Sequence, residues 1–133
     1  MPKTRFQNKI PKPPSQKNAE VLSSGLTSLE NALSNGVNVG YGTDLCWSPK
    51  SYQGDGLLIH EKVCGATEAL RHCTLNNARI VRMEGKIGEI TPGAYADLVI
   101  LDSNPLKSMS CFSQKSNSIV AVVQAGKPVR DDK

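Results

Sequence analysis

Little in this sequence would place it in a membrane or direct it to export. It has no run of about 18 apolar residues, which argues against a membrane-spanning helix. The N-terminus, MPKTRFQNKIPKPPSQK, is basic and proline-rich, and it lacks the apolar stretch of about 7–15 residues that a secretory signal requires. We therefore expect a cytoplasmic protein with no membrane partner.

Paired cysteines and aromatic residues are also scarce. The four cysteines form no C-x-x-C pair and show no spacing typical of a small disulfide-bonded domain, so we expect buried or half-buried free thiols. Only 5% of the residues are aromatic, and no basic stripe is interleaved with them. The net charge of +4 comes from the two ends, because residues 20–102 carry ten acidic and six basic side chains. These features argue against a nucleic-acid partner.

The first half of the chain has helical periodicity followed by a short apolar strand. Alanine and leucine recur at three- and four-residue steps and predict an amphipathic helix over about 16–34. Ser15 is a suitable N-cap, and Asn35-Gly36 is a suitable stop. The β-branched residues and glycines that follow predict a strand over 37–42. Helix, tight turn and buried strand together resemble half of a repeating β/α unit.

The spacing of apolar residues changes from a helical to a strand-like period near Met83, where we expect a domain boundary. Thr67 and Thr74 are suitable helix N-caps. The expected elements are a loop over 45–56, short helices over 57–63 (closing near Gly65), 68–74 and 75–83, a strand over 96–102, a linker over 103–117 and a strand that turns back at residues 125–127. The resulting division is an irregular segment over 1–15, an α-β-α portion over 16–83 and a β-rich portion over 84–133.

Three segments carry a resemblance to a known family: ALSNGVNVGYGTDL (32–45), EALRHCTLNNARIVRMEGKIGEITPGAYADLVILDSNPL (68–106) and IVAVVQAGKPV (119–129). Their order resembles the C-terminal part of a metal-dependent amidohydrolase of the imidazolonepropionase-like and prolidase-like branch. The resemblance implies an α/β fold. That fold would be the last part of a (β/α)8 TIM-type barrel, with part of a composite β-sandwich.

The G-T-D at 42–44 matches the family position at the end of the last barrel strand. Active sites of such barrels lie at the carboxyl ends of the strands. The resemblance therefore implies that Asp44 binds a divalent metal, usually zinc, and takes a proton from the attacking water. The structural alternative for Asp44 is a turn or helix-cap residue. Asp97 matches a sandwich position and is expected to be structural, while Thr74, Asn76 and Gly93 are expected to be caps and turns.

The other metal ligands of the family have no counterpart in these 133 residues. A hydrolytic zinc site needs about three protein ligands and an open position, so we expect this chain to bind no metal and to be inactive by itself. His60 and His72 are expected to be exposed or capping residues, and a novel His60/Cys64 site is the less favoured alternative. The predicted function is hydrolysis of a carbon–nitrogen bond in a small-molecule amide, such as a dipeptide or N-acyl amino acid, in an intact enzyme. A non-catalytic remnant or interaction module without metal is the alternative, and the substrate-binding residues are not indicated.

Overall fold

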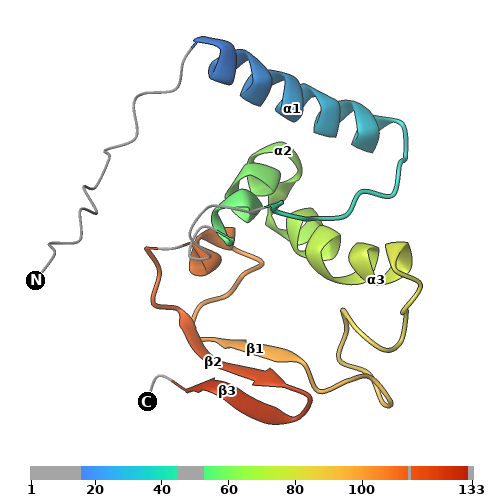
Figure 1. Cartoon of the computed structure of the whole chain (residues 1–133), viewed down its shortest axis with the longest axis vertical. Helices are drawn as coiled ribbons and strands as arrows, with labels where there is room; N and C mark the ends of the chain where they lie inside the picture. The colour runs from blue at the N-terminus through green and yellow to red at the C-terminus, as the bar shows by residue number, and fades with distance from the viewer. Residues whose placement is uncertain (1–15, 45–52, 114, 132–133) are drawn as a thin grey trace, which may run out of the picture.

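The computed structural model describes residues 16–44, 53–113 and 115–131 (Figure 1). Helices occupy the first part and an antiparallel sheet the second. The helical elements are α1 (Gln16–Ser34), α2 (Asp55–Arg71), the π-helix η2 (His72–Asn76), α3 (Asn77–Ile80) and the 3-10 helix η3 (Met109–Phe112). The strands are β1 (Leu98–Leu101), β2 (Ile119–Gln124) and β3 (Lys127–Asp131), in the order β1-β2-β3. Within the described ranges, no helix is long and apolar enough to cross a membrane.

Helix α1 ends where the sequence predicted. Gly36 adopts a left-handed φ of 69°, and its N–H donates to Leu33 O at 3.0 Å, while Val37 N–H donates to Ala32 O at 3.0 Å. These two bonds form a Schellman motif, which glycine favours because its φ is positive without a Cβ clash. The predicted N-cap Ser15 lies outside the described residues.

The predicted strand over 37–42 is wrong, because residues 37–44 belong to no strand and have no regular secondary structure. An extended chain becomes a strand only when its backbone groups pair with a neighbouring strand. In the described ranges this segment bonds instead to the side chains of Asn76 and Asn77 and to two helix carbonyls, those of Ala32 and His72. Figure 1 shows it leaving the end of α1 and running above α3 towards α2.

The helices between residues 55 and 80 are more continuous than expected. A break does occur at Gly65, whose φ of 81° and ψ of 163° kink α2. No new helix starts at Thr74, contrary to its predicted capping role. The Thr74 hydroxyl donates to Leu70 O at 2.7 Å, a bond to the preceding turn that a helix interior allows. Helical structure therefore runs through η2 to Ile80.

The core lies between α2 and η3, and η3 falls inside the linker predicted over 103–117. Leu57, Ala69 and Met109 form the buried cluster, and Met109 is fully buried. Ser108 begins η3 with its hydroxyl accepting from Ser110 N–H at 3.1 Å. The linker prediction was wrong because a single turn of four residues is too short to produce a detectable periodicity.

The sheet matches the predicted β-rich part, with a shorter first strand. β1 and β2 pair antiparallel with Leu98 opposite Val123, and the register shifts between Ile100 and Leu101. This irregularity interrupts the alternation of faces that a regular strand has, so Leu98 and Leu101 are the half-buried residues of β1. The predicted turn is confirmed: residues 125 and 126 have positive φ angles of 49° and 76° and connect β2 to β3.

Candidate functional site

Asp44 stands at the end of the extended segment 37–44. It is exposed, and its φ of 48° is left-handed. Such a conformation is uncommon outside glycine, although aspartate tolerates it better than most residues. The sequence placed Asp44 at the end of a strand. The structure places it at the end of an irregular segment whose path is fixed by bonds to the helices. Residues 45–52 lie outside the described ranges.

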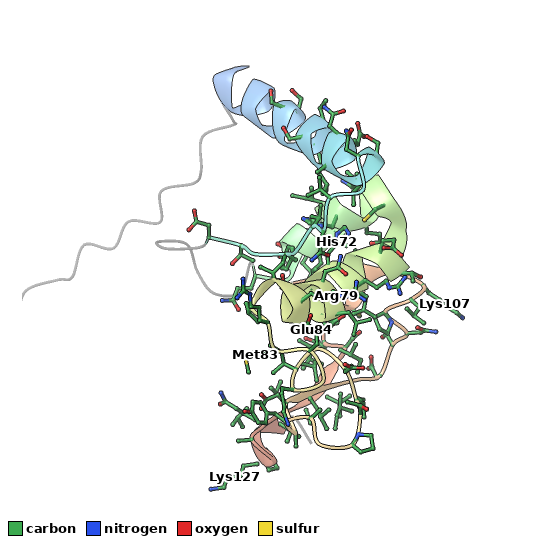
Figure 2. All side chains as sticks on the ribbon, turned by 90° about the vertical axis from the view of Figure 1, so that its right-hand side faces the viewer. His72, Arg79, Met83, Glu84, Lys107 and Lys127 are labelled. Atoms are coloured by element: carbon green, nitrogen blue, oxygen red, sulfur yellow. The ribbon has the colours of Figure 1, made fainter. Side chains whose placement is uncertain are left out.

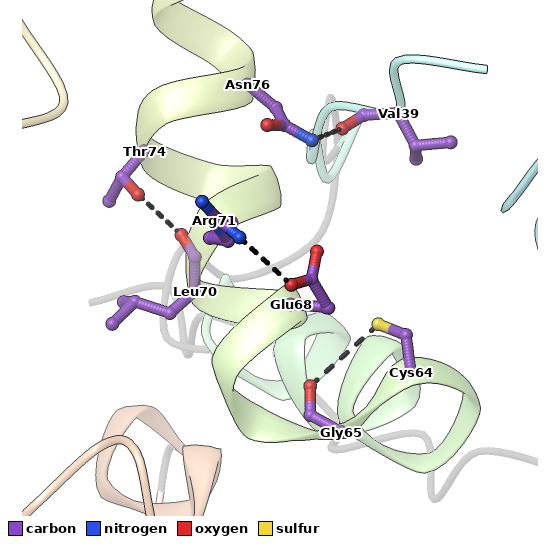
Figure 3. A network of polar contacts seen from close by, with 8 residues as sticks. All are labelled: Val39, Cys64, Gly65, Glu68, Leu70, Arg71, Thr74 and Asn76. Atoms are coloured by element: carbon purple, nitrogen blue, oxygen red, sulfur yellow. Dashed lines mark hydrogen bonds and ion pairs between the residues drawn. The ribbon is translucent and has the colours of Figure 1, made fainter. Parts of the chain in front are cut away.

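Two adjacent asparagines hold this segment against the helices. Asn76 Nδ2 donates to Val39 O at 2.9 Å (Figure 3). Asn77 makes two bonds to one residue: Nδ2 donates to Tyr41 O at 2.8 Å, and Oδ1 accepts from Tyr41 N–H at 3.1 Å. Tyr41 N–H also points at His72 O, at 3.2 Å. Side-chain amides thus replace the backbone pairing that a strand neighbour would supply.

Gly40 is required for this close contact. A Cβ at that position would lie 2.3 Å from Asn77 Oδ1 and 2.6 Å from Ile80 Cδ1. Both distances are shorter than van der Waals contact, so only glycine lets the segment approach α3 this closely. Asn76 is no helix cap, contrary to prediction, because its amide bonds across to the extended segment.

The Tyr41 side chain links the segment to the start of α2. Its hydroxyl donates to Gln53 O at 2.6 Å, and its ring meets that of His60 edge-on, with centroids 5.2 Å apart. Burial raises the pKa of the Tyr41 hydroxyl, with smaller contributions from Cys73 and Asp55. Tyr41 is therefore a neutral hydrogen-bond donor at neutral pH.

His60 and His72 form a direct imidazole pair, contrary to the prediction of exposed or capping residues. Their Nδ1 atoms lie 3.0 Å apart, and His72 is 1% exposed. Figure 2 labels His72 among the helices, above the sheet. Since one Nδ1 must donate and the other accept, at least one ring is neutral. Burial lowers the pKa of both histidines; the charge of His72 lowers that of His60 further, and Glu68 partly opposes the shift of His72.

The described residues do not fit a metal by themselves. Within residues 16–44, 53–113 and 115–131, no three His, Cys, Asp or Glu side chains are close enough together to hold one. The Cys64 thiol donates a hydrogen bond to His60 O at 3.1 Å, within its own helix. The alternative His60/Cys64 site lacks a third metal ligand among the described residues. Cys64, Cys73 and Cys111 are free thiols and half-buried or buried, as predicted; Cys46 lies outside the described residues.

Asp97 has the structural role that was predicted for it. Its Oδ1 accepts from Ala125 N–H at 2.7 Å, which ties the β2–β3 turn to the start of β1. Gly93, at a φ of 89°, lies in a turn as expected.

Tyr41, His72 and Asn77 were missed as parts of the site. One signal could have indicated Asn77: asparagine disfavours helix interiors because its side chain competes for backbone groups. Two consecutive asparagines in a helical stretch therefore suggest a partner outside the helix. The histidine pair had no such signal, because its members lie 12 residues apart.

The amidohydrolase family model matches residues 7–129. The chain belongs to the amidohydrolase family. Among curated relatives, this amidohydrolase chain is 30% identical over 131 residues to a 5-methylthioadenosine/S-adenosylhomocysteine deaminase of Acetivibrio thermocellus, covering 84% of this chain and 30% of the relative. A 5'-deoxyadenosine deaminase of Methanobrevibacter smithii is 28% identical over 110 residues, covering 74% and 25%.

Solved structures agree with this assignment. An amidohydrolase superposes with a TM-score of 0.81 at 34% identity, over 93% of this chain and 30% of that protein. A prolidase solved with N-methylphosphonate-L-proline superposes with a TM-score of 0.80 at 38% identity, over 87% and 28%. This amidohydrolase chain thus spans less than a third of the length of these relatives.

Proposed function

We propose that this chain supplies Asp44 to the hydrolysis of a carbon–nitrogen bond in a small-molecule amide. The observation that carries the proposal is the fixed path of residues 39–41, which Asn76 and Asn77 hold and which leads to the exposed carboxylate of Asp44. The same chain is 38% identical to a prolidase. We also propose that residues 16–83 belong to a barrel and residues 84–133 to a sandwich.

In this proposal the Asp44 carboxylate takes a proton from the water that attacks the carbonyl carbon. The carbon–nitrogen bond then breaks, and the proton passes from Asp44 to the leaving nitrogen. A general base positioned in this way contributes about 10²–10⁴-fold to the rate. Asp44 is also proposed as one ligand of a divalent-metal centre, with zinc the metal that the family resemblance implies. Its other ligands would come from outside the described residues.

The substrate is proposed to be a dipeptide or an N-acyl amino acid, following the prolidase similarity. Deamination of an adenine nucleoside is the second candidate, because the curated relatives carry deaminase names. A metal-free interaction module is the alternative of a different class, supported by the lack of three clustered donors in the described part of the chain.

A chimera tests the proposal. The segment of the solved prolidase that matches this chain, 28% of that protein, is replaced by the present 133 residues. We expect the chimera to bind metal by elemental analysis and to hydrolyse a proline dipeptide, whereas the isolated chain binds none. Asp44→Asn keeps the side-chain size and should lower kcat by about 10²–10⁴-fold. A folded chimera that binds no metal would support the interaction module, and release of ammonia from 5'-deoxyadenosine would support the second candidate.

A further inference from the structure

A pocket, here called the α1–η2 pocket, lies between the end of α1 and the helical stretch from α2 to α3. It measures about 500 Å³, which is within the range of small-molecule sites. Its lining combines apolar, charged and amide side chains, among them Leu33, Val37, Glu68, Leu75, Asn76 and Arg79. Asp44 is not one of its lining residues.

His72 brings a buried nitrogen without a partner to this pocket. The residue is 1% exposed, and its Nδ1 is engaged by His60. Its Nε2 forms no hydrogen bond with another described residue. In the described ranges, however, no unpaired side-chain nitrogen or oxygen is sealed from solvent. Nε2 therefore keeps a small exposed area, and it faces the pocket that His72 lines.

The histidine pair allows this Nε2 to act as a hydrogen-bond donor. When His60 Nδ1–H donates to His72 Nδ1, the ring proton of neutral His72 is on Nε2. A buried donor without an acceptor costs free energy. An acceptor in the pocket therefore stabilises this tautomer of the pair, and an anionic acceptor does so most strongly because charge-assisted bonds are stronger.

The charged residues of the pocket offer one positive and one negative group. Arg79 forms no ion pair with another described residue, and helical side chains lean towards the N-terminus, which directs Arg79 back towards η2. Glu68 lies one helical turn before His72. Its Oε1 is 3.4 Å from Arg71 Nη1, and Figure 3 shows its other oxygen pointing away from Arg71. The pocket thus presents a cation and a carboxylate oxygen that can still accept.

A ligand with both charges fits this lining better than a simple ion. A simple carboxylate would be repelled by Glu68, and a simple amine would be repelled by Arg79. An α-amino acid carries an ammonium and a carboxylate on one carbon. Its carboxylate can accept from His72 Nε2–H and Arg79 while its ammonium donates to Glu68. An apolar side chain would then contact Leu33 and Val37.

The backbone at the centre of the pocket is also unusual. His72, Leu75 and Asn76 belong to η2, which is a π-helix. Such turns are rare and are found frequently at functional sites. We propose that the α1–η2 pocket binds a free α-amino acid with an apolar side chain. The proposal goes beyond the proposed function, because it requires neither Asp44 nor a metal.

Calorimetric titration of the 133-residue chain with three related compounds tests the ligand class. L-Leucine should bind with a dissociation constant below about 10 mM. 4-Methylvalerate lacks the ammonium and L-leucinamide lacks the carboxylate, so each should bind at least about ten-fold more weakly. Histidine ¹⁵N NMR of the same chain should show L-leucine moving His72 Nε2 towards the protonated shift while His72 Nδ1 stays unprotonated.

Two substitutions test the residues. Arg79→Gln should weaken L-leucine binding at least about ten-fold. Arg82→Gln is the matched control, because Arg82 is an exposed arginine that does not line the pocket, and it should leave binding within about two-fold. Glu68→Gln should remove the preference for L-leucine over 4-methylvalerate. All three are surface changes and should keep the parental melting temperature within about 2 °C.

Four results would overturn the proposal. The first is the absence of saturable L-leucine binding below about 10 mM. The second is binding of 4-methylvalerate or L-leucinamide as tight as that of L-leucine. The third is equal weakening by Arg79→Gln and Arg82→Gln. The fourth is a His72 ¹⁵N spectrum that saturating L-leucine leaves unchanged. The comparison of ligands and the NMR experiment use the parent chain, so they decide even where a variant fails to fold.

Discussion

The two-point contact between Asn77 and Tyr41 gives the sharpest test of how the segment leading to Asp44 is held. Asn77→Ala removes one donor and one acceptor, at 2.8 and 3.1 Å from Tyr41 O and N. Each bond contributes about 1 kcal/mol. Alanine regains about 0.5 kcal/mol of helix propensity. The expected net loss in free energy of unfolding is therefore about 1.5 kcal/mol.

Asn76→Ala is the matched control, because it removes a single bond, to Val39 O, from the neighbouring residue. The same reasoning gives a loss of about 0.5 kcal/mol. In thermal unfolding of the 133-residue chain, these losses correspond to about 6 °C and about 2 °C, at roughly 4 °C per kcal/mol. Urea denaturation with an unchanged m-value would give the same order of effect.

Asn77→Asp distinguishes hydrogen bonding from packing. The aspartate keeps the shape and one acceptor, but it replaces the donor with an anionic oxygen facing Tyr41 O. At pH 7 it should destabilise the chain more than alanine does, because two acceptors then face each other without a proton between them. Equal stability of the Asn76→Ala and Asn77→Ala variants, or an Asn77→Asp variant as stable as the parent, would refute the reasoning.

Three further predictions concern the helices around this segment. Because the pKa values of His60 and His72 are lowered in the folded state, their contribution to stability is complete above the unfolded value of about 6.5 and is lost as the pH falls towards the folded values. The urea midpoint should decrease from pH 7 to 5.5, and a double glutamine variant should flatten this dependence. Gly88→Ala brings a Cβ within 2.6 Å of a backbone carbonyl oxygen, whereas Gly85→Ala, also at positive φ, meets open space; the first should lower the melting temperature clearly more than the second. Met109→Ala empties a fully buried site and should cost about 2–5 kcal/mol by urea denaturation, and a cost below about 1 kcal/mol would contradict its place in the core.

The elements that follow from the sequence are those whose signals are local. The helix over 16–34 and its stop at Gly36 need only periodicity and one left-handed residue, and both are confirmed. The return turn at residues 125–127 is likewise encoded within a short stretch, whereas the structural role expected of Asp97 came from the family resemblance. The family resemblance also came from the order of such stretches, and the family model confirms it.

Only the tertiary structure decided where distant residues meet. Segment 37–44 has a strand-like composition but is no strand, because Asn76 and Asn77 occupy the backbone groups that a neighbouring strand would pair. The burial of Met109 depends on Ala69 and Leu57 of α2, which lie 40 and 52 residues away in the chain. Hydrophobic burial and side-chain hydrogen bonds depend on partners, and a partner that is remote in the sequence leaves no local pattern.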